Sequence, residues 1–404
     1  MTRALRSVLC LNDFEPLARR KLPKPIYAYV SGAVEDNASA RANRDAFARY
    51  TFVPRMLRNV SARSTEVELF GQRYSAPVGI APMGISALSA YDGDRVLALA
   101  GGEANVPVIM SGSSLTRVED VMKVAPRTWF QAYLPGQIDQ IRALIERVGR
   151  AGVQTLVITV DTPVAANREN NVRAGFSTPL RPSLGLAWQG ISHPRWLFGT
   201  FLQTILRRGM PHFENNYATR GAPILSGNVL RDFADRAHLD WSHLEQIRAM
   251  WPGTLIVKGI LHPDDARRAR DIGVQGVIVS NHGGRQLDGA VSPLRMLPAI
   301  VAAVGQDVTV MLDSGVRRGT DVVKALALGA RCVFVGRPFN YAATIAGQPG
   351  VAHGIRLIKQ ELSCDMGMLG VTRIEDIGPQ VLGPSEVIDP FDSLEQGGRS
   401  FQTD

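Results

Sequence analysis

The sequence has few cysteines and no long run of apolar residues. Its 404 residues include three cysteines, Cys10, Cys332 and Cys364, which lie far apart. This number and spacing argue against a disulfide framework and a zinc site of clustered thiolates, and they favour a reducing compartment. No stretch of eighteen apolar residues is present, so no membrane-spanning helix is expected. Residues 1–16 lack the apolar core of a secretory signal peptide.

Acidic residues are also under-represented relative to basic ones. The 37 Asp and Glu residues are outnumbered by 45 Lys and Arg, which gives a formal net charge of +8. Such a charge favours anionic partners in general: acidic metabolites, phosphates, lipid headgroups or nucleic acid. The interleaving of basic and aromatic residues expected of a nucleic-acid surface is missing outside one long insertion, at about 165–240, so no nucleic-acid partner is predicted.

The chain is rich in short apolar runs that alternate with amphipathic segments. Runs of β-branched residues with little alternation indicate parallel strands buried on both faces. Strands are predicted over 76–83, 106–112, 128–134, 155–161, 254–260, 276–281, 308–315 and 332–337. Helices are predicted between them, for example over 137–152, 263–273 and 319–330. Eight such units close most naturally into an α/β fold, the (β/α)8 TIM barrel. An open doubly wound sheet is the alternative, because periodicity does not show closure.

The predicted domain is one barrel over residues 1–384. It has an N-terminal helical cap at 1–75 and a long insertion after strand four, at about 165–240. The polar, punctuated segment 385–404 is predicted to be a flexible tail.

Polar residues follow each predicted strand, and in a barrel all these ends meet at one mouth. Because strands commonly end in polar residues, the serines and glycines at these ends need no functional explanation. That tendency does not explain Lys258 in "LIVKGI", because a buried lysine needs a partner or a shifted pKa. After strands seven and eight, "LDSGVRRGTD" (312–321) and "VGRP" (335–338) offer backbone amides and arginines to an anion. These residues predict a phosphorylated ligand or cofactor.

The segments "SNHGGRQLD" (280–288) and "LDSGVRRGTDVVKALALGA" (312–330) resemble the FMN-dependent 2-hydroxy-acid dehydrogenases and oxidases. "LPKPIYAYVSGAVEDN", "IAPMG", "WFQAY", "TVDTP" and "VKGI" extend the resemblance over nearly the whole chain. The resemblance implies bound FMN and the oxidation of a 2-hydroxy acid to a 2-keto acid.

The resemblance also implies a role for each site residue. His282 looks like the catalytic base, Asp161 like its orienting partner, and Tyr133 like a hydroxyl donor. Lys258 would lie by the N1–C2 carbonyl edge of the flavin and favour its anionic reduced form. The implied substrate-binding residues are Tyr29, Tyr133, Arg168 and Arg285. The implied FMN-binding residues are Pro82, Met83, Gly84, Ser113, Gln131, Thr159, Lys258, Ser280, Asp313, Ser314, Gly315, Arg317, Gly336 and Arg337. The other histidines show no metal-ligand spacing, so no metal site is predicted.

The insertion contains five arginines and no acidic residue between Asn170 and Phe213. A helical wheel over 195–208 places seven side chains on one apolar face: Trp196, Leu197, Phe198, Phe201, Leu202, Ile205 and Leu206. It places Thr200, Gln203, Thr204 and Arg207 on the other face. A basic amphipathic helix with Trp and Phe fits an interfacial membrane anchor. A helix packed on the barrel or on another subunit is the alternative.

The resemblance to membrane-bound members implies peripheral contact with the cytoplasmic membrane through 177–213, a quinone acceptor and a homotetramer. Gly84 agrees with a dehydrogenase, whereas Leu115 leaves the size of the substrate open. Three other functions remain as alternatives. They are a soluble oxidase that reduces O2 to H2O2, an FMN isomerase without need of the His282 and Arg285 pair, and a basic protein without bound flavin.

Overall fold

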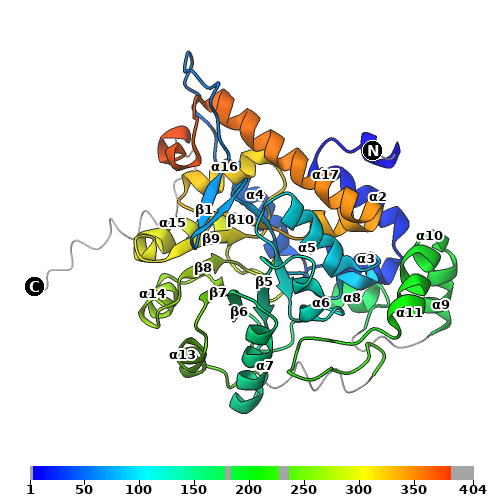
Figure 1. Cartoon of the computed structure of the whole chain (residues 1–404). Coiled ribbons are helices and arrows are strands. Elements are labelled where there is room, and N and C mark those ends of the chain that lie inside the picture. The colour runs from blue at the N-terminus through cyan, green and yellow to red at the C-terminus, as the bar shows by residue number, and fades with distance from the viewer. Residues whose placement is uncertain (1–2, 178–182, 227–235, 384–404) are drawn as a thin grey trace, which may run out of the picture.

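The computed structural model describes residues 3–177, 183–226 and 236–383. Eight parallel strands form one sheet in the order β3-β10-β9-β8-β7-β6-β5-β4. An isolated parallel bridge between Ile80 and Val108 joins the two outer strands, and the Ile80 amide donates to the Pro107 carbonyl at 2.9 Å. The sheet therefore closes into a barrel, and the open-sheet alternative is wrong (Figure 1).

Seven strands are shorter than their predicted runs, because the flanking residues turn into the loops at the barrel ends, and the strand predicted over 254–260 has the same bounds in the structure. The strands are β3 (Val78–Ile80), β4 (Ile109–Ser111), β5 (Trp129–Ala132), β6 (Thr155–Thr159), β7 (Thr254–Ile260), β8 (Gly276–Val279), β9 (Thr309–Asp313) and β10 (Val333–Val335). The helices after them are α5 (Gly93–Glu103), α6 (Val118–Met122), α7 (Ile138–Arg150), α13 (Trp241–Met250), α14 (Pro263–Asp271), α15 (Pro293–Val304), α16 (Gly319–Ala327) and α17 (Arg337–Leu369). The three helices predicted over 137–152, 263–273 and 319–330 correspond to α7, α14 and α16.

The barrel interior has an apolar layer and a polar layer, because every second strand residue points inward. The apolar layer forms one hydrophobic cluster with residues of the hairpin β1 (Val67–Leu69) and β2 (Gln72–Tyr74). Its strand members are Ile109, Trp129, Val157, Ile256, Ile278, Met311 and Phe334. The residues two positions further along these strands are Ser111, Gln131, Thr159, Lys258, Ser280, Asp313 and Gly336. The apolar layer and the polar layer are therefore two residues apart along each of these strands, which is one period of a β-strand.

Residues before the barrel contribute to both of its ends. Helices α1 (Arg3–Arg6), α2 (Phe14–Lys21), α3 (Lys24–Ser31) and α4 (Ala38–Ala48) come first in the chain. The α3 segment reaches the polar mouth, where the carbonyls of Val30 and Gly32 accept hydrogen bonds from Arg337. The β1–β2 hairpin packs on the apolar layer, and the Trp129 indole N–H donates to the Tyr74 hydroxyl at 3.2 Å. The hairpin therefore covers the end of the barrel opposite the mouth.

The insertion after β6 is largely helical where it is described. It contains α8 (Glu169–Arg173), α9 (Leu184–Ile191), α10 (Pro194–Trp196), the π-helical η3 (Leu197–Leu202) and α11 (Gln203–Arg208). Figure 1 shows α9, α10 and α11 gathered at one side of the barrel, near α3 and α8. None of the helices in the described part of the chain is both long enough and apolar enough to cross a membrane.

The helix predicted over 195–208 is present, and Phe198 and Leu206 of its predicted apolar face are exposed, but Trp196, which was predicted to share that face, is buried with the threonines. Trp196, Thr200 and Thr204 are the buried residues, with 7, 3 and 6% of their surface exposed, whereas Phe198 and Leu206 are 67 and 84% exposed. The Trp196 indole N–H donates to the Leu88 carbonyl at 2.7 Å, and the Thr204 hydroxyl donates to the Thr200 carbonyl at 2.7 Å. Hydroxyls satisfied within their own helix can be buried, so the threonine side faces the protein.

Candidate active site

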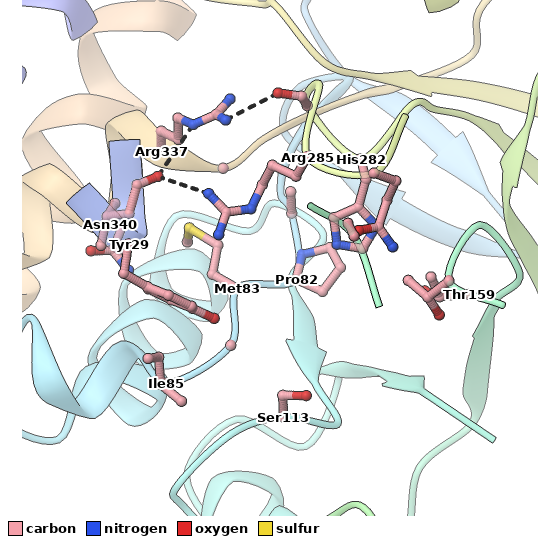
Figure 2. Close-up of a pocket in the computed structure, with 18 of the residues that line it drawn as sticks. Tyr29, Pro82, Met83, Ile85, Ser113, Thr159, His282, Arg285, Arg337 and Asn340 are labelled. Atoms are coloured by element: carbon pink, nitrogen blue, oxygen red, sulfur yellow. Dashed lines mark hydrogen bonds between the residues drawn. The ribbon is translucent and has the colours of Figure 1, made fainter. Parts of the chain in front are cut away.

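A cavity of about 340 Å³ opens at the carboxyl ends of the strands. Residues from the strand ends, from α3 and from the insertion line it, and Figure 2 shows part of this lining. Of the predicted site residues, the cavity is lined by Tyr29, Pro82, Met83, Gly84, Ser113, Tyr133, Thr159, Arg168, Lys258, His282, Arg285, Asp313, Ser314, Gly315, Arg317, Gly336 and Arg337. Gln131, Asp161 and Ser280 stand behind this lining.

An imidazole and a carboxylate form the polar centre of the cavity. His282 Nδ1 lies 2.9 Å from Asp161 Oδ1, and His282 Nε2 lies 3.4 Å from the Tyr133 hydroxyl. Burial lowers the pKa of His282 below its ordinary value; the Asp161 carboxylate opposes this shift and the Lys258 ammonium adds to it. Burial alone would raise the pKa of Asp161, but His282 and Lys258 outweigh it and lower that pKa. The pair therefore rests as a neutral imidazole beside a carboxylate.

The backbone of the loop that carries His282 is unusual. His282 has a φ of 57°, and the next two residues, Gly283 and Gly284, have φ of 69° and 74°. Three successive left-handed residues turn the loop tightly, and two of them are glycines because glycine adopts this conformation without steric cost. The His282 amide donates to the Ser280 hydroxyl at 3.0 Å, which fixes the loop to the end of β8.

Lys258 is held by an ion pair rather than left alone. Its Nζ lies 2.9 Å from Asp313 Oδ2 and donates to the Ser280 hydroxyl at 2.8 Å. Burial would lower the pKa of Lys258, but the Asp313 and Asp161 carboxylates outweigh that effect and raise it. The lysine is therefore a charged group at the floor of the cavity, as its sequence context predicts.

Three arginines converge on the mouth. Arg285 donates to the Gly32 carbonyl at 2.6 Å, and Arg337 donates to the same carbonyl at 3.0 Å. The Arg285 guanidinium also lies 5.2 Å from the centre of the Tyr29 ring. Burial, with the neighbouring Arg168 and Arg337, lowers the pKa of Arg285 to about 9. Such concentrated positive charge in a buried site favours an anionic ligand.

Arg168 and the His282–Asp161 pair are joined through Gln286, a residue that was not predicted. Arg168 Nη2 donates to Gln286 Oε1 at 2.9 Å, and Gln286 Nε2 donates to the Asp161 backbone carbonyl at 3.0 Å. Gln286 is part of the segment "SNHGGRQLD", so its position next to Arg285 was an available signal. Asn340, Ile85, Leu88, Phe176, Phe213, Ile224 and Arg236 also line the cavity and were not predicted.

The floor and the distal side of the cavity fit an FMN molecule. Gln131 Nε2 and Thr159 Oγ1 are buried without a hydrogen-bond partner among the described residues. A heterocycle with ring nitrogens and carbonyls would satisfy them, as buried polar groups require. The phosphate end is offered by Gly315, with a φ of 95°, and by Arg317 and Arg337. Burial, with Arg337 and Arg44 nearby, lowers the pKa of Arg317 to about 10, which again favours an anion.

The chain matches a known protein family over most of its length. The sequence model of the FMN-dependent dehydrogenase family matches residues 18–384. The chain is 39% identical over 370 residues to an L-lactate dehydrogenase of Azorhizobium caulinodans, covering 91% of this chain and 96% of that protein. It is 38% identical over 379 residues to an L-lactate dehydrogenase of Yersinia pestis, covering 93 and 98%.

Two solved structures are similar over almost their full length. One is described as the monotopic membrane protein (S)-mandelate dehydrogenase, with a TM-score of 0.87 and 34% identity over 93% of this chain and 99% of that chain. The other is a mandelate oxidase, with a TM-score of 0.79 and 34% identity over 95 and 100% of the two chains.

Proposed function

The chain belongs to the family of FMN-dependent dehydrogenases that act on 2-hydroxy acids, and on that premise we propose that it oxidises an L-2-hydroxy acid and passes the electrons to a membrane quinone. The observation that carries the first half is the meeting of the His282–Asp161 pair with Arg285 in one buried cavity. The second half rests on the exposed apolar side chains of the insertion.

The substrate carboxylate would bind between Arg285 and Arg168, with the Tyr29 hydroxyl beside it. A guanidinium binds a carboxylate through two parallel hydrogen bonds, and it does so more strongly in a site shielded from water. Arg285 is already oriented by its hydrogen bond to the Gly32 carbonyl and by the Tyr29 ring. Little side-chain entropy is then lost when the substrate binds.

His282 would take a proton from the substrate at Nε2. Its Nδ1 is engaged by Asp161, so Nε2 is the nitrogen that faces Tyr133 and the cavity. Asp161 would stabilise the imidazolium that results, and Tyr133 would hydrogen-bond the reacting oxygen. When bound, FMN supplies the acceptor for the two electrons that leave the substrate. The buried ammonium of Lys258 would stabilise negative charge at the cavity floor.

The insertion is the part of the chain that would contact a membrane. Leu184, Trp188, Phe198 and Leu206 are 92, 67, 67 and 84% exposed. The segment also carries arginines and no acidic residue, which suits an interface with anionic lipids. A peripheral position on the inner face of the cytoplasmic membrane would place the enzyme beside its quinone. Gly84, which in the resemblance to the family agrees with a dehydrogenase, also supports a quinone acceptor over oxygen.

Vesicle flotation and acceptor kinetics test this proposal. The holoenzyme should float with anionic vesicles, and Trp188→Ser combined with Phe198→Ser should leave it in the lower fraction. Leu57→Ser is the matched control, because Leu57 is fully exposed but lies outside the insertion. Flotation unaffected by the serine variants, together with a changed elution volume in gel filtration, would show instead that this face contacts another subunit.

The acceptor is tested separately. Anaerobic reduction of the bound flavin by a 2-hydroxy acid should be followed by fast reoxidation with a soluble quinone and slow reoxidation with oxygen. Rapid oxygen consumption during turnover would identify a soluble oxidase that makes hydrogen peroxide. A preparation without flavin would contradict both versions.

A further inference from the structure

One side of the cavity is not used by the groups assigned to the carboxylate, the proton or the FMN. Five apolar residues line it, and each has 4 to 7% of its surface exposed: Ile85, Leu88, Phe176, Phe213 and Ile224. They belong to one hydrophobic cluster with Leu115 and Trp196. We propose that this apolar wall binds the substituent on the hydroxyl-bearing carbon, and that the enzyme prefers 2-hydroxy acids whose substituent is apolar and bulkier than methyl. This inference rests on the proposed oxidation of 2-hydroxy acids.

The side chain of Ile85 reaches this wall from a backbone conformation that is energetically unfavourable for isoleucine. Ile85 has a φ of 48°, a left-handed conformation that is rare for a β-branched residue. The Ile85 amide donates to the Ser113 carbonyl at 3.0 Å, and the Leu88 amide donates to the Ile85 carbonyl at 2.9 Å. Strained residues kept by their surroundings are concentrated at functional sites. Figure 2 shows Ile85 near the ring of Tyr29 and away from Arg337.

The returning end of the insertion supplies the opposite part of the wall. The Phe213 amide donates to the Ala222 carbonyl at 3.2 Å, and the Ile224 amide donates to the Pro211 carbonyl at 3.1 Å. The Glu214 amide donates to the Ser114 carbonyl at 3.1 Å, which ties this turn to the loop after β4. Phe213 and Ile224 are therefore positioned by backbone hydrogen bonds.

The wall is also connected to the exposed helix of the insertion. The Trp196 indole donates to the carbonyl of Leu88, which lines the cavity. On the cap side, the ring centres of Phe176 and Tyr29 lie 4.7 Å apart. The insertion thus both presents apolar side chains outward and closes the substrate cavity.

The chemistry of the wall ranks the substrates. Each methylene that leaves water for an apolar surface is expected to improve kcat/KM about fourfold, the equivalent of about 0.8 kcal/mol. A second carboxylate placed against these five residues would lose its hydration without a hydrogen-bond partner. Arg236 also lines the cavity, but its guanidinium stacks on the Tyr133 ring at 5.0 Å and its Nε donates to the Leu134 carbonyl. A hydroxy diacid is therefore the informative competitor in the test.

The experiment compares kcat/KM of the FMN-loaded enzyme for lactate, 2-hydroxybutyrate, 2-hydroxyhexanoate, mandelate and malate, with an artificial dye as acceptor. The expected result is a rise of about fourfold per methylene up to 2-hydroxyhexanoate, with malate as the poorest substrate. Lactate as the best substrate, or malate above 2-hydroxyhexanoate, would overturn the inference. Because the dye replaces the natural acceptor, this outcome is independent of the membrane and quinone results. Failure of every acid to reduce the flavin would instead contradict the proposed function.

Variants of the wall assign the preference to named residues. Ile224→Ala and Phe213→Leu should each lower kcat/KM for 2-hydroxyhexanoate about tenfold while changing lactate less than about twofold. Leu225→Ala, next to Ile224 but 41% exposed and outside the cavity lining, should change neither. Equal losses of kcat/KM for 2-hydroxyhexanoate and lactate would show that these residues do not bind the substituent.

A second measurement covers the case in which the variants fail to bind FMN. Straight-chain carboxylates from acetate to hexanoate should inhibit the unaltered enzyme competitively. Their inhibition constants should fall about fourfold per added methylene. Constants independent of chain length would contradict the apolar wall.

Discussion

The pairing of His282 with Asp161 makes the sharpest prediction, which concerns Asp161→Asn. The two side chains are 18 and 12% exposed and 2.9 Å apart, so their hydrogen bond is charge-assisted and largely shielded from solvent. Such a bond contributes about 1.5–3 kcal/mol when one partner is ionised. At about 1.4 kcal/mol per factor of ten, kcat/KM should fall about 10- to 150-fold. An asparagine amide can also donate to Nδ1, which would leave the proton on Nε2 and block proton uptake there.

The pH dependence gives a second readout of the same change. The proposed mechanism requires neutral His282, so kcat/KM should be retained above the pKa of His282 and lost as pH falls through it. Burial already lowers this pKa, and the Asp161 carboxylate partly restores it. Asp161→Asn removes the restoring charge, so the acidic limb should move to lower pH.

The assay is steady-state oxidation of a 2-hydroxy acid with a dye acceptor across the pH range, with flavin content measured for each variant. Asp139→Asn is the matched control, because Asp139 is an exposed carboxylate in the first turn of α7. A loss of less than about threefold with an unmoved acidic limb would refute the role given to Asp161. A loss shared by Asp139→Asn would indicate a general effect of charge.

Three further changes follow from the site and its support. Lys258→Met leaves the buried Asp313 carboxylate without its ion pair, so thermal unfolding should show a loss of about 3–5 kcal/mol, and Lys258→Arg should lose less. Gly84→Ala puts a methyl group 3.2 Å from the Tyr29 hydroxyl, which would displace a group that binds the substrate. KM should therefore rise about tenfold in steady-state kinetics, with little change in the melting temperature of the protein. Burial raises the pKa of Asp94 to about 6, so folding stability should fall as pH rises from about 4 to 6, and Asp94→Asn should flatten that slope in thermal melts.

The barrel could be predicted because its signal is local and repeated. Each strand combines an apolar run with a polar residue at its carboxyl end, as Ile256 and Lys258 show on β7. The two residues point to the same side because the strand period is two. Lys258 therefore had to reach the mouth once the apolar layer was recognised. Its ion-pair partner Asp313 lies at the carboxyl end of β9, two positions after the apolar residue Met311, and so points into the same polar layer.

The apolar wall could not be predicted, because no periodicity links its parts. Phe213 and Ile224 come from a long connection, and their positions depend on backbone hydrogen bonds in an irregular turn. The left-handed conformation of Ile85 has no sequence signal, since β-branched residues rarely adopt it. The burial of Trp196 apart from Phe198 and Leu206 was not predicted for a related reason. A helical wheel of period 3.6 does not anticipate the π-helical segment that follows Trp196.

The N-terminal cap and the loop that carries His282 form one structural unit, although they lie far apart in the chain. Asn43 of α4 and Asn281 exchange two buried hydrogen bonds, of 2.8 and 2.7 Å, directly before the strained His282. Asp288, at the far end of the same loop, accepts the first amides of α4 from Ala38 and Ser39 at 3.1 and 2.8 Å. The loop is therefore held at both ends by one helix. A left-handed His282 costs energy, and a buried, fully paired amide contact is a strong means of keeping it in place. The position of His282 in the cavity thus depends on α4 as well as on β8.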